Sequence, residues 1–226
     1  MKKYFYLFII LLIGSNAFAN TNHYKSITKI EMDVFRNGEK IGFSNYFFKH
    51  KNNEMEVKNN TEFEVKLLGV NLLSIKSNSV EKYKNNKLVS FNSNTIQNNK
   101  KKYVILKVNE DNNKFIINGS SFKGKTKNNK VIGNWWNTNI LSATSQISPL
   151  SGSIKEQTVK LIKKEIVIIN DRSYDAIKFK LKSKNQDLPE DKKLDFDIWL
   201  DPKEGFIIKI SYERMGKWEY ILNNYE

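Results

Sequence analysis

Few side chains in this 226-residue sequence are available as a general base near neutral pH or as a zinc or haem ligand. It contains two histidines, His23 and His50, and no cysteine. Histidine is the side chain whose unperturbed pKa lies nearest neutrality, and zinc and haem sites draw largely on His and Cys. His23 lies near the N-terminus, His50 lies between two lysines, and neither has an identifiable nucleophile partner. We therefore predict no catalytic residue, no metal site and no cofactor.

Three aspartates in the C-terminal part of the chain are the remaining candidates for acid–base chemistry or calcium binding. Asp195 and Asp197 alternate along an expected strand, so their side chains share one face with Trp199, and Asp201 follows in a turn with Pro202. A calcium loop would supply denser oxygen ligands within one turn. We interpret these residues as a solvated strand face and an Asp-Pro turn. A hydrolase built on them is the least favoured hypothesis.

Two adjacent tryptophans, Trp135 and Trp136, are the strongest candidates for ligand contacts. An indole offers a large apolar body and one polar N–H. Adjacent residues point in opposite directions in a strand and diverge by about 100° in a helix, so the two rings cannot share one buried environment. One of them is expected to face a cavity, a groove or solvent. We predict that Trp135, Trp136, Ile140 and Leu141 contact a ligand.

These four residues belong to a segment, residues 133–152, that does not read as a strand or a tight turn. Ile140, Leu141 and Ala143 suggest one or two helical turns, and Pro149 cannot continue a helix. We predict that this segment is a crossover between two sets of strands.

On both sides of the crossover, apolar and polar residues alternate with the period of two expected for half-buried strands. Asn37-Gly38 predicts a two-residue hairpin, after which Ile41, Phe43 and Phe47 continue the apolar side. Residues 159–169 fit either one bulged strand or two short strands. The regular spacing of turns predicts an all-β, antiparallel meander that forms a curved sheet, half-barrel or barrel-like fold with one short helical crossover.

The N-terminus has the three parts of a secretory signal peptide: Lys2 and Lys3, an apolar run over residues 4–13, and the exit Ala17-Phe18-Ala19. The apolar run has roughly half of the ~20 residues that a membrane-spanning helix needs. We predict a signal peptide over residues 1–19, cleavage after Ala19, a single β domain over residues 20–226, and a periplasmic or secreted mature protein.

The formal charge of +14 comes almost entirely from lysines scattered through turns and strands. Nucleic-acid-binding surfaces usually cluster Arg with Lys, so we predict no nucleic-acid partner. Weak attraction to an anionic membrane surface remains open. Strands such as residues 61–67 carry charges on one face and apolar residues on the other. This pattern suits an apolar interior and not an outer-membrane barrel, so we predict that the protein is not an integral membrane protein.

Several short motifs in order along the chain resemble the exported bacterial proteins of the domain of unknown function 6134 family. They are Asn37-Gly38-Glu39-Lys40-Ile41-Gly42, Trp136-Asn137 with Asn139-Ile140-Leu141, Phe196-Asp197-Ile198-Trp199-Leu200-Asp201, Gly205, and Trp218-Glu219-Tyr220. The resemblance implies no activity and no catalytic residues. In outline, the expected sheet is also similar to half-barrel carriers that shield lipids or lipoprotein acyl chains in the bacterial envelope.

The leading hypothesis is a non-enzymatic binding protein that holds an apolar ligand, such as a lipid or acyl chain, on the concave face of the sheet. Strands that are apolar on one face must bury that face, and a single short helical segment covers little of it. The alternative is an envelope protein–protein interaction or assembly factor that holds its partner through a strand edge or the tryptophan segment.

Overall fold

The structure is a computed structural model that describes residues 24, 26–68, 70–109 and 113–226. The predicted signal peptide and His23 lie outside these residues. In the described part of the chain, fifteen strands form one sheet.

The strands before the crossover are β1 (Lys29–Arg36), β2 (Glu39–Lys51), β3 (Glu54–Leu67), β4 (Val70–Lys84), β5 (Lys87–Gln97), β6 (Lys100–Asn109), β7 (Lys114–Gly119), β8 (Lys123–Lys127) and β9 (Val131–Ile132). The remaining elements are η3 (Thr138–Leu141), β10 (Ser145–Ile147), β11 (Ile154–Ile169), β12 (Arg172–Ser183), η4 (Glu190–Lys192), β13 (Asp195–Asp201), β14 (Phe206–Glu213) and β15 (Lys217–Tyr225).

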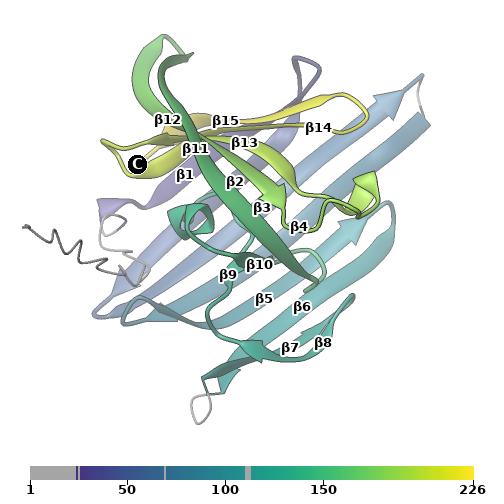
Figure 1. Cartoon of the computed structure of the whole chain (residues 1–226), viewed down its shortest axis with the longest axis vertical. Helices are drawn as coiled ribbons and strands as arrows, with labels where there is room; N and C mark the ends of the chain where they lie inside the picture. The colour runs from purple at the N-terminus through teal and green to yellow at the C-terminus, as the bar shows by residue number, and fades with distance from the viewer. Residues whose placement is uncertain (1–23, 25, 69, 110–112) are drawn as a thin grey trace, which may run out of the picture.

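The first and last strands, β1 and β15, pair at the middle of the sheet, and strands extend outward from them in sequence order. The two edges are therefore β8 and β9, which are separated in the sequence only by residues 128–130. All pairings are antiparallel except that of β9 with β10. The N-terminal strands form a wide curved layer, and β11 to β15 cross it (Figure 1). The predicted all-β, antiparallel meander is confirmed, and of the predicted shapes the curved half-barrel fits the open sheet.

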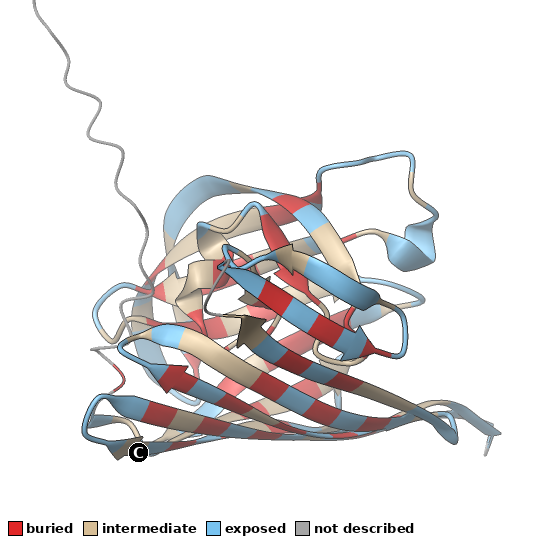
Figure 2. Ribbon diagram, turned by 90° about the horizontal axis from the view of Figure 1, so that it is seen from below, coloured by how far each residue is buried: buried red, intermediate tan, exposed pale blue. Residues whose placement is uncertain are grey.

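The sheet has an inner and an outer face because side chains alternate between its two sides. Buried and exposed residues alternate along the strands (Figure 2). Asparagine-rich turns return the chain beside itself: Asn37 and Gly38 have φ values of 50° and 85°, which two-residue hairpins require.

One sequence prediction about β2 is wrong. Phe43 and Phe47 are exposed on the outer face, whereas Tyr46 and Phe48 are buried on the inner face. The ladder between β1 and β2 skips Ile41, which is an extra, bulged residue. Ile41 itself still packs against the core. A one-residue shift of this kind sends the following side chains to the opposite face.

Residues 159–169 form part of one strand, β11, whose pairing with β12 skips Ile162. The bulged single strand is therefore the correct alternative.

The crossover, residues 133–152, contains the 3-10 turn η3 and also the short strand β10. Its C-terminal part lies against the inner face of β5 to β7. In Figure 1, β9 and β10 lie in front of these strands. The backbone N–H of Ser121 donates to the carbonyl of Ser151 at 2.9 Å, and Ser93 Oγ donates to the carbonyl of Pro149 at 2.5 Å. A cluster of buried apolar side chains, separate from the main core, packs at this contact: Phe91, Val104, Leu106, Phe115, Ile117, Ile132 and Ile147.

Candidate ligand-binding site

A buried carboxylate, Glu81 on β4, fastens the crossover to the sheet. Its Oε1 accepts hydrogen bonds from Trp136 Nε1 at 2.8 Å and from Asn134 Nδ2, and its Oε2 accepts one from Tyr83 Oη at 2.6 Å. Burial raises the pKa of Glu81, and the three hydrogen bonds oppose that rise. The arrangement satisfies the indole and amide N–H groups that enter the core with the crossover.

Trp136 is a core residue and is 1% exposed. Its ring meets those of Tyr24, Phe48 and Tyr83 edge-on, with centroid distances of 5.2, 5.4 and 5.7 Å. Edge-to-face contacts of this kind are favoured by the ring quadrupoles. Ile140, from the same crossover, is fully buried in the same cluster.

Trp135 points to the other side of the crossover and lines a cavity of about 380 Å³. Its ring packs against Phe196 and Tyr220 at centroid distances of 5.1 and 6.3 Å. The two indoles thus occupy different environments, as the sequence argument requires. Of the four residues predicted to contact a ligand, Trp135 lines the cavity, Trp136 and Ile140 lie in the core, and Leu141 packs at the core's edge.

An aromatic wall forms one side of the cavity. Phe196 and Tyr212 meet edge-on at 5.1 Å, Tyr212 stacks with Trp218 at 5.8 Å, and Trp218 meets Phe63 at 5.6 Å. The aromatic residues that line the cavity are Tyr46, Phe63, Trp135, Phe196, Tyr212, Trp218 and Tyr220. They come from β2, β3, β13, β14, β15 and the crossover, so the curvature of the sheet is needed to bring them together.

Another part of the cavity lining is a polar belt on the inner face of β2 to β4. Its lining residues are Ser44, Asn59, Thr61, Ser77 and Ser79. Ser44 Oγ and Thr61 Oγ1 lie 2.7 Å apart, and Asn59 Nδ2 donates to Ser44 Oγ at 3.2 Å. Ser79 Oγ is buried and has no hydrogen-bond partner among the described residues. A buried polar atom without a partner is uncommon and calls for an explanation.

The polar belt and Glu81 were not recognised as functional candidates from the sequence. A signal was nevertheless present, because Ser77, Ser79 and Glu81 occupy the same alternate positions as the apolar Ile75 and Tyr83 of the same strand. Polar residues in the inward-facing register of a strand indicate either a buried network or a polar site.

The cavity opens at one end of the half-barrel. Two of its lining residues, Leu72 and Met215, are 40% and 83% exposed. Leu72 lies near the turn between β3 and β4, and Met215 lies in the turn between β14 and β15.

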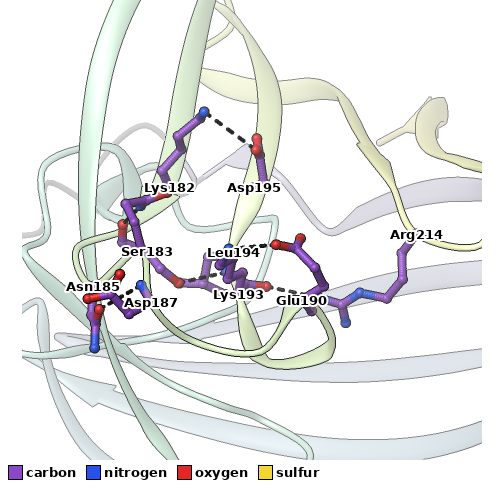
Figure 3. A network of polar contacts seen from close by, with 10 residues as sticks. Lys182, Ser183, Asn185, Asp187, Glu190, Lys193, Leu194, Asp195 and Arg214 are labelled. Atoms are coloured by element: carbon purple, nitrogen blue, oxygen red, sulfur yellow. Dashed lines mark hydrogen bonds and ion pairs between the residues drawn. The ribbon is translucent and has the colours of Figure 1, made fainter.

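Polar contacts connect the loop between β12 and β13 to Arg214, in the turn next to Met215 (Figure 3). Leu194 lines the cavity, and its backbone N–H donates to Ser183 Oγ at 2.7 Å. Arg214 Nη2 donates to the carbonyls of Lys193 and Glu190, at 2.9 and 3.3 Å.

The C-terminal carboxylates lie away from the cavity. Asp197 forms ion pairs with Lys178 and Lys180 at 3.0 and 3.1 Å, and Asp195 pairs with Lys182 at 3.6 Å (Figure 3 shows the last pair). Burial acts to raise the pKa of Asp197, but the lysine contacts outweigh it and hold that pKa below its ordinary value.

Trp199 shares the outer face of Asp197, as the sequence predicts. Lys178 Nζ lies 4.7 Å from the centroid of its ring. Asp201 is buried, and its Oδ1 accepts a hydrogen bond from the Lys203 backbone N–H at 2.9 Å, so it caps the Asp-Pro turn. In the described part of the chain, no group of three His, Asp or Glu side chains is placed to hold a metal ion.

Comparisons with known proteins agree with the architecture. The fold is similar to the crystal structure of a beta-barrel-like protein of domain of unknown function DUF1849 from Brucella abortus, with a TM-score of 0.62 and 10% sequence identity, covering 88% of this chain and 97% of that chain. No match to this chain is found among curated proteins. Among the described residues, no helix is long and apolar enough to cross a membrane. The model of a domain of unknown function (DUF6134) matches residues 32–223, and the chain therefore belongs to that family.

Proposed function

We propose that this chain is an exported, non-enzymatic binding protein that holds a ligand with an apolar body, such as an acyl chain, in the cavity between the crossover and the sheet. The volume of about 380 Å³ falls within the range of roughly 300–1,000 Å³ that small-molecule sites occupy. The aromatic wall would contact the apolar body, and the polar belt would fix its orientation.

The observation that carries this proposal is a cavity of about 380 Å³ that opens at one end of the half-barrel and is lined by the aromatic wall. Protein cores are close-packed, so a concave apolar space of this size with a few polar groups is a candidate ligand site. The buried Ser79 hydroxyl, which lines the cavity, has no hydrogen-bond partner among the described residues. A ligand with an apolar body and a polar atom would contact the aromatic wall and hydrogen-bond to that hydroxyl.

A cavity-filling substitution tests the proposal. Ser79→Leu places a larger side chain at a buried, cavity-lining position and removes the unpartnered hydroxyl. Asn78→Leu makes the same kind of change on the exposed face of the same strand and is the matched control. Binding of the neutral apolar dye N-phenyl-1-naphthylamine, followed by its fluorescence, should weaken by about tenfold or more in Ser79→Leu, because filling the site removes apolar contact area.

The control variant should bind the dye as the parent protein does, and both variants should keep the β-sheet circular dichroism spectrum. Equal dye binding by the parent and Ser79→Leu would place the dye elsewhere. No saturable binding by the parent would overturn the proposal.

The export component has its own test. The intact mass of the protein purified from its native host should correspond to a chain that begins at Asn20, and osmotic shock should release it. Retention of residues 1–19, or recovery only after detergent extraction, would overturn this component.

A second candidate function, binding of a protein partner, is favoured by β11. Only residues 154–156 of β11 pair with β10, and in the described structure the rest of the strand has β12 as its sole neighbour in the sheet. The open part exposes Leu161, Ile162, Ile166 and Ile168. Open apolar strand edges accept an added strand. Ile166→Lys should abolish association with a partner while leaving dye binding unchanged, whereas unchanged association would exclude this surface.

A further inference from the structure

The cations that line the cavity differ from those on the rest of the protein. Arg36, Arg172 and Arg214 are the only arginines among 38 Lys and Arg residues. Two of the three, Arg36 and Arg214, line the cavity, and in the described structure its lining includes no Lys, Asp or Glu. The cavity is therefore positively charged at the side chains that a ligand would meet, and arginine supplies that charge.

Arg36 is held in place at the end of β1 by neutral groups. Its guanidinium carbon lies 6.0 Å from the Trp218 ring, and its Nη2 donates to the carbonyl of Met215. Its Nε is buried and has no hydrogen-bond partner among the described residues. A guanidinium has five N–H donors in a planar fork, so most of its donors remain available.

Arg214 is fixed next to the same turn. Its Nη2 donates to two loop carbonyls, those of Lys193 and Glu190, and its own carbonyl accepts a hydrogen bond from Trp218 Nε1 at 2.9 Å. Trp218 thus contacts both arginines, one through its ring and one through its N–H. The turn between β14 and β15 brings the two guanidinium groups to the same end of the cavity, where Met215 is exposed.

Within the described ranges, neither cavity arginine forms an ion pair with a carboxylate. In the described structure, every ion pair uses a lysine as its cation, including those on the outer face of β12 and β13. An arginine oriented by carbonyl groups and lacking a carboxylate partner presents the geometry that binds carboxylate or phosphate oxygens in pairs.

We infer that the ligand carries an anionic carboxylate or phosphate group, bound by Arg36 and Arg214 at the open end, with its apolar body directed inward along the aromatic wall. This inference rests on the proposed function. An anion at the mouth keeps partial contact with water, so its desolvation is less unfavourable than it would be in the interior. The apolar body then occupies the space between Trp135, Phe63 and the polar belt.

Ligands that share one chain and differ in their head group test the inference. Dodecanoate and dodecyl phosphate are the anionic ligands, dodecanol is neutral, dodecyltrimethylammonium is cationic, and inorganic phosphate has no apolar body. Displacement of N-phenyl-1-naphthylamine reports binding of each amphiphile, and calorimetry reports binding of phosphate. The two anionic amphiphiles should bind the parent protein about tenfold or more tightly than dodecanol, as charge-assisted hydrogen bonds imply.

Substitutions assign this preference to the arginines. Arg36→Gln and Arg214→Gln should each weaken binding of dodecanoate and dodecyl phosphate by about tenfold while leaving dodecanol binding unchanged. Arg36→Lys keeps the charge without the fork and should fall between the parent and Arg36→Gln. Lys217→Gln removes an equal charge near the same turn, from a residue that does not line the cavity, and should bind as the parent does. Circular dichroism and denaturant unfolding verify that each variant is folded.

The outcomes separate this inference from the proposed function. Equal affinity for dodecanol and dodecanoate, unaffected by either arginine substitution, would overturn the anionic head group and leave the apolar-ligand function standing. Binding of inorganic phosphate alone, lost in Arg36→Gln, would support the anion site and overturn the apolar body. Failure of the dye and of all amphiphiles to bind the parent would overturn the proposed function itself.

Discussion

Two neighbouring residues, Trp135 and Trp136, divide the concave face into a filled region and an open region. On the side of Trp136, aromatic rings meet edge-on, and Glu81 accepts hydrogen bonds from Trp136 and Asn134 of the crossover. On the side of Trp135, a cavity of about 380 Å³ remains, and Ser79 Oγ has no partner among the described residues. The same crossover completes the core with Trp136 and lines the cavity with the preceding residue, Trp135.

The difference shows how a curved sheet with a single crossover can combine stability with an open site. The hydrogen bonds to Glu81 hold the crossover against the sheet in the filled region. Arginines, aromatic rings and hydroxyl groups then line the part that stays open. The two regions should respond differently to substitution, and the following predictions test this contrast in order of decreasing effect.

Trp136→Ala should give the largest effect, because it removes a buried aromatic side chain. We expect the free energy of unfolding to fall by about 3 to 5 kcal/mol, measured by denaturant unfolding. Trp135→Ala should lower it much less, because its ring already borders a cavity. Equal losses in the two variants would contradict the division into filled and open regions.

Removal of the Glu81 carboxylate should have the next largest effect on stability. Glu81→Leu leaves the Trp136 and Asn134 donors unpaired in the core, which should lower the free energy of unfolding by about 3 kcal/mol. Glu81→Gln keeps an acceptor for these donors and should be much less destabilising at neutral pH. A Gln variant as unstable as the Leu variant would show that the charge, and not the hydrogen bonding, is essential.

Ligand binding should distinguish the tryptophans in the opposite sense from stability. Trp135→Ala should weaken dodecanoate binding by about 1 to 3 kcal/mol, roughly fivefold to 150-fold, because an apolar contact is lost. Trp199→Phe, on the outer face, is the matched control and should leave the affinity unchanged. Unaltered affinity in Trp135→Ala would remove this residue from the site.

The pH dependence of stability should depend on Glu81. Because its pKa is raised in the folded state, its contribution is fully present below the ordinary glutamate pKa and is lost as pH rises through the raised value. Asp197, whose pKa is lowered, acts in the opposite direction. The difference in unfolding free energy between the parent and Glu81→Gln, measured from acidic to neutral pH, isolates the first contribution. The unfolding free energy of the parent should fall relative to that of Glu81→Gln as pH rises. A difference that does not change with pH would contradict the assignment.

The smallest effect is expected on the outer face. Asp197→Asn breaks partly exposed ion pairs with Lys178 and Lys180, which should change the free energy of unfolding by at most about 1 kcal/mol. Ligand affinity should stay the same. A marked loss of binding would revive a functional role for these carboxylates.

Local chemistry in the sequence determined the strands, their turns and the overall class of fold. A period of two marks a half-buried strand wherever it lies, and the Asn37-Gly38 pair accepts the positive φ values of a tight hairpin regardless of its surroundings. The bulge in β11 was an open alternative for the same reason, since Lys163 and Lys164 interrupt the apolar pattern within the strand itself. The argument that Trp135 and Trp136 need different environments was also local.

Only the tertiary structure decided which indole faces the cavity, that Glu81 anchors the crossover, and that Arg36 and Arg214 both line the cavity. Glu81 and Trp136 lie 55 residues apart in the sequence, and their contact depends on how the crossover enters the curved sheet. Strand register is just as decisive, because one bulged residue, Ile41, sends Phe43 and Phe47 to the outer face. Hydrophobic alternation shows that each strand has two different faces. The pairing of distant strands decides which side chains lie together on the same face of the sheet.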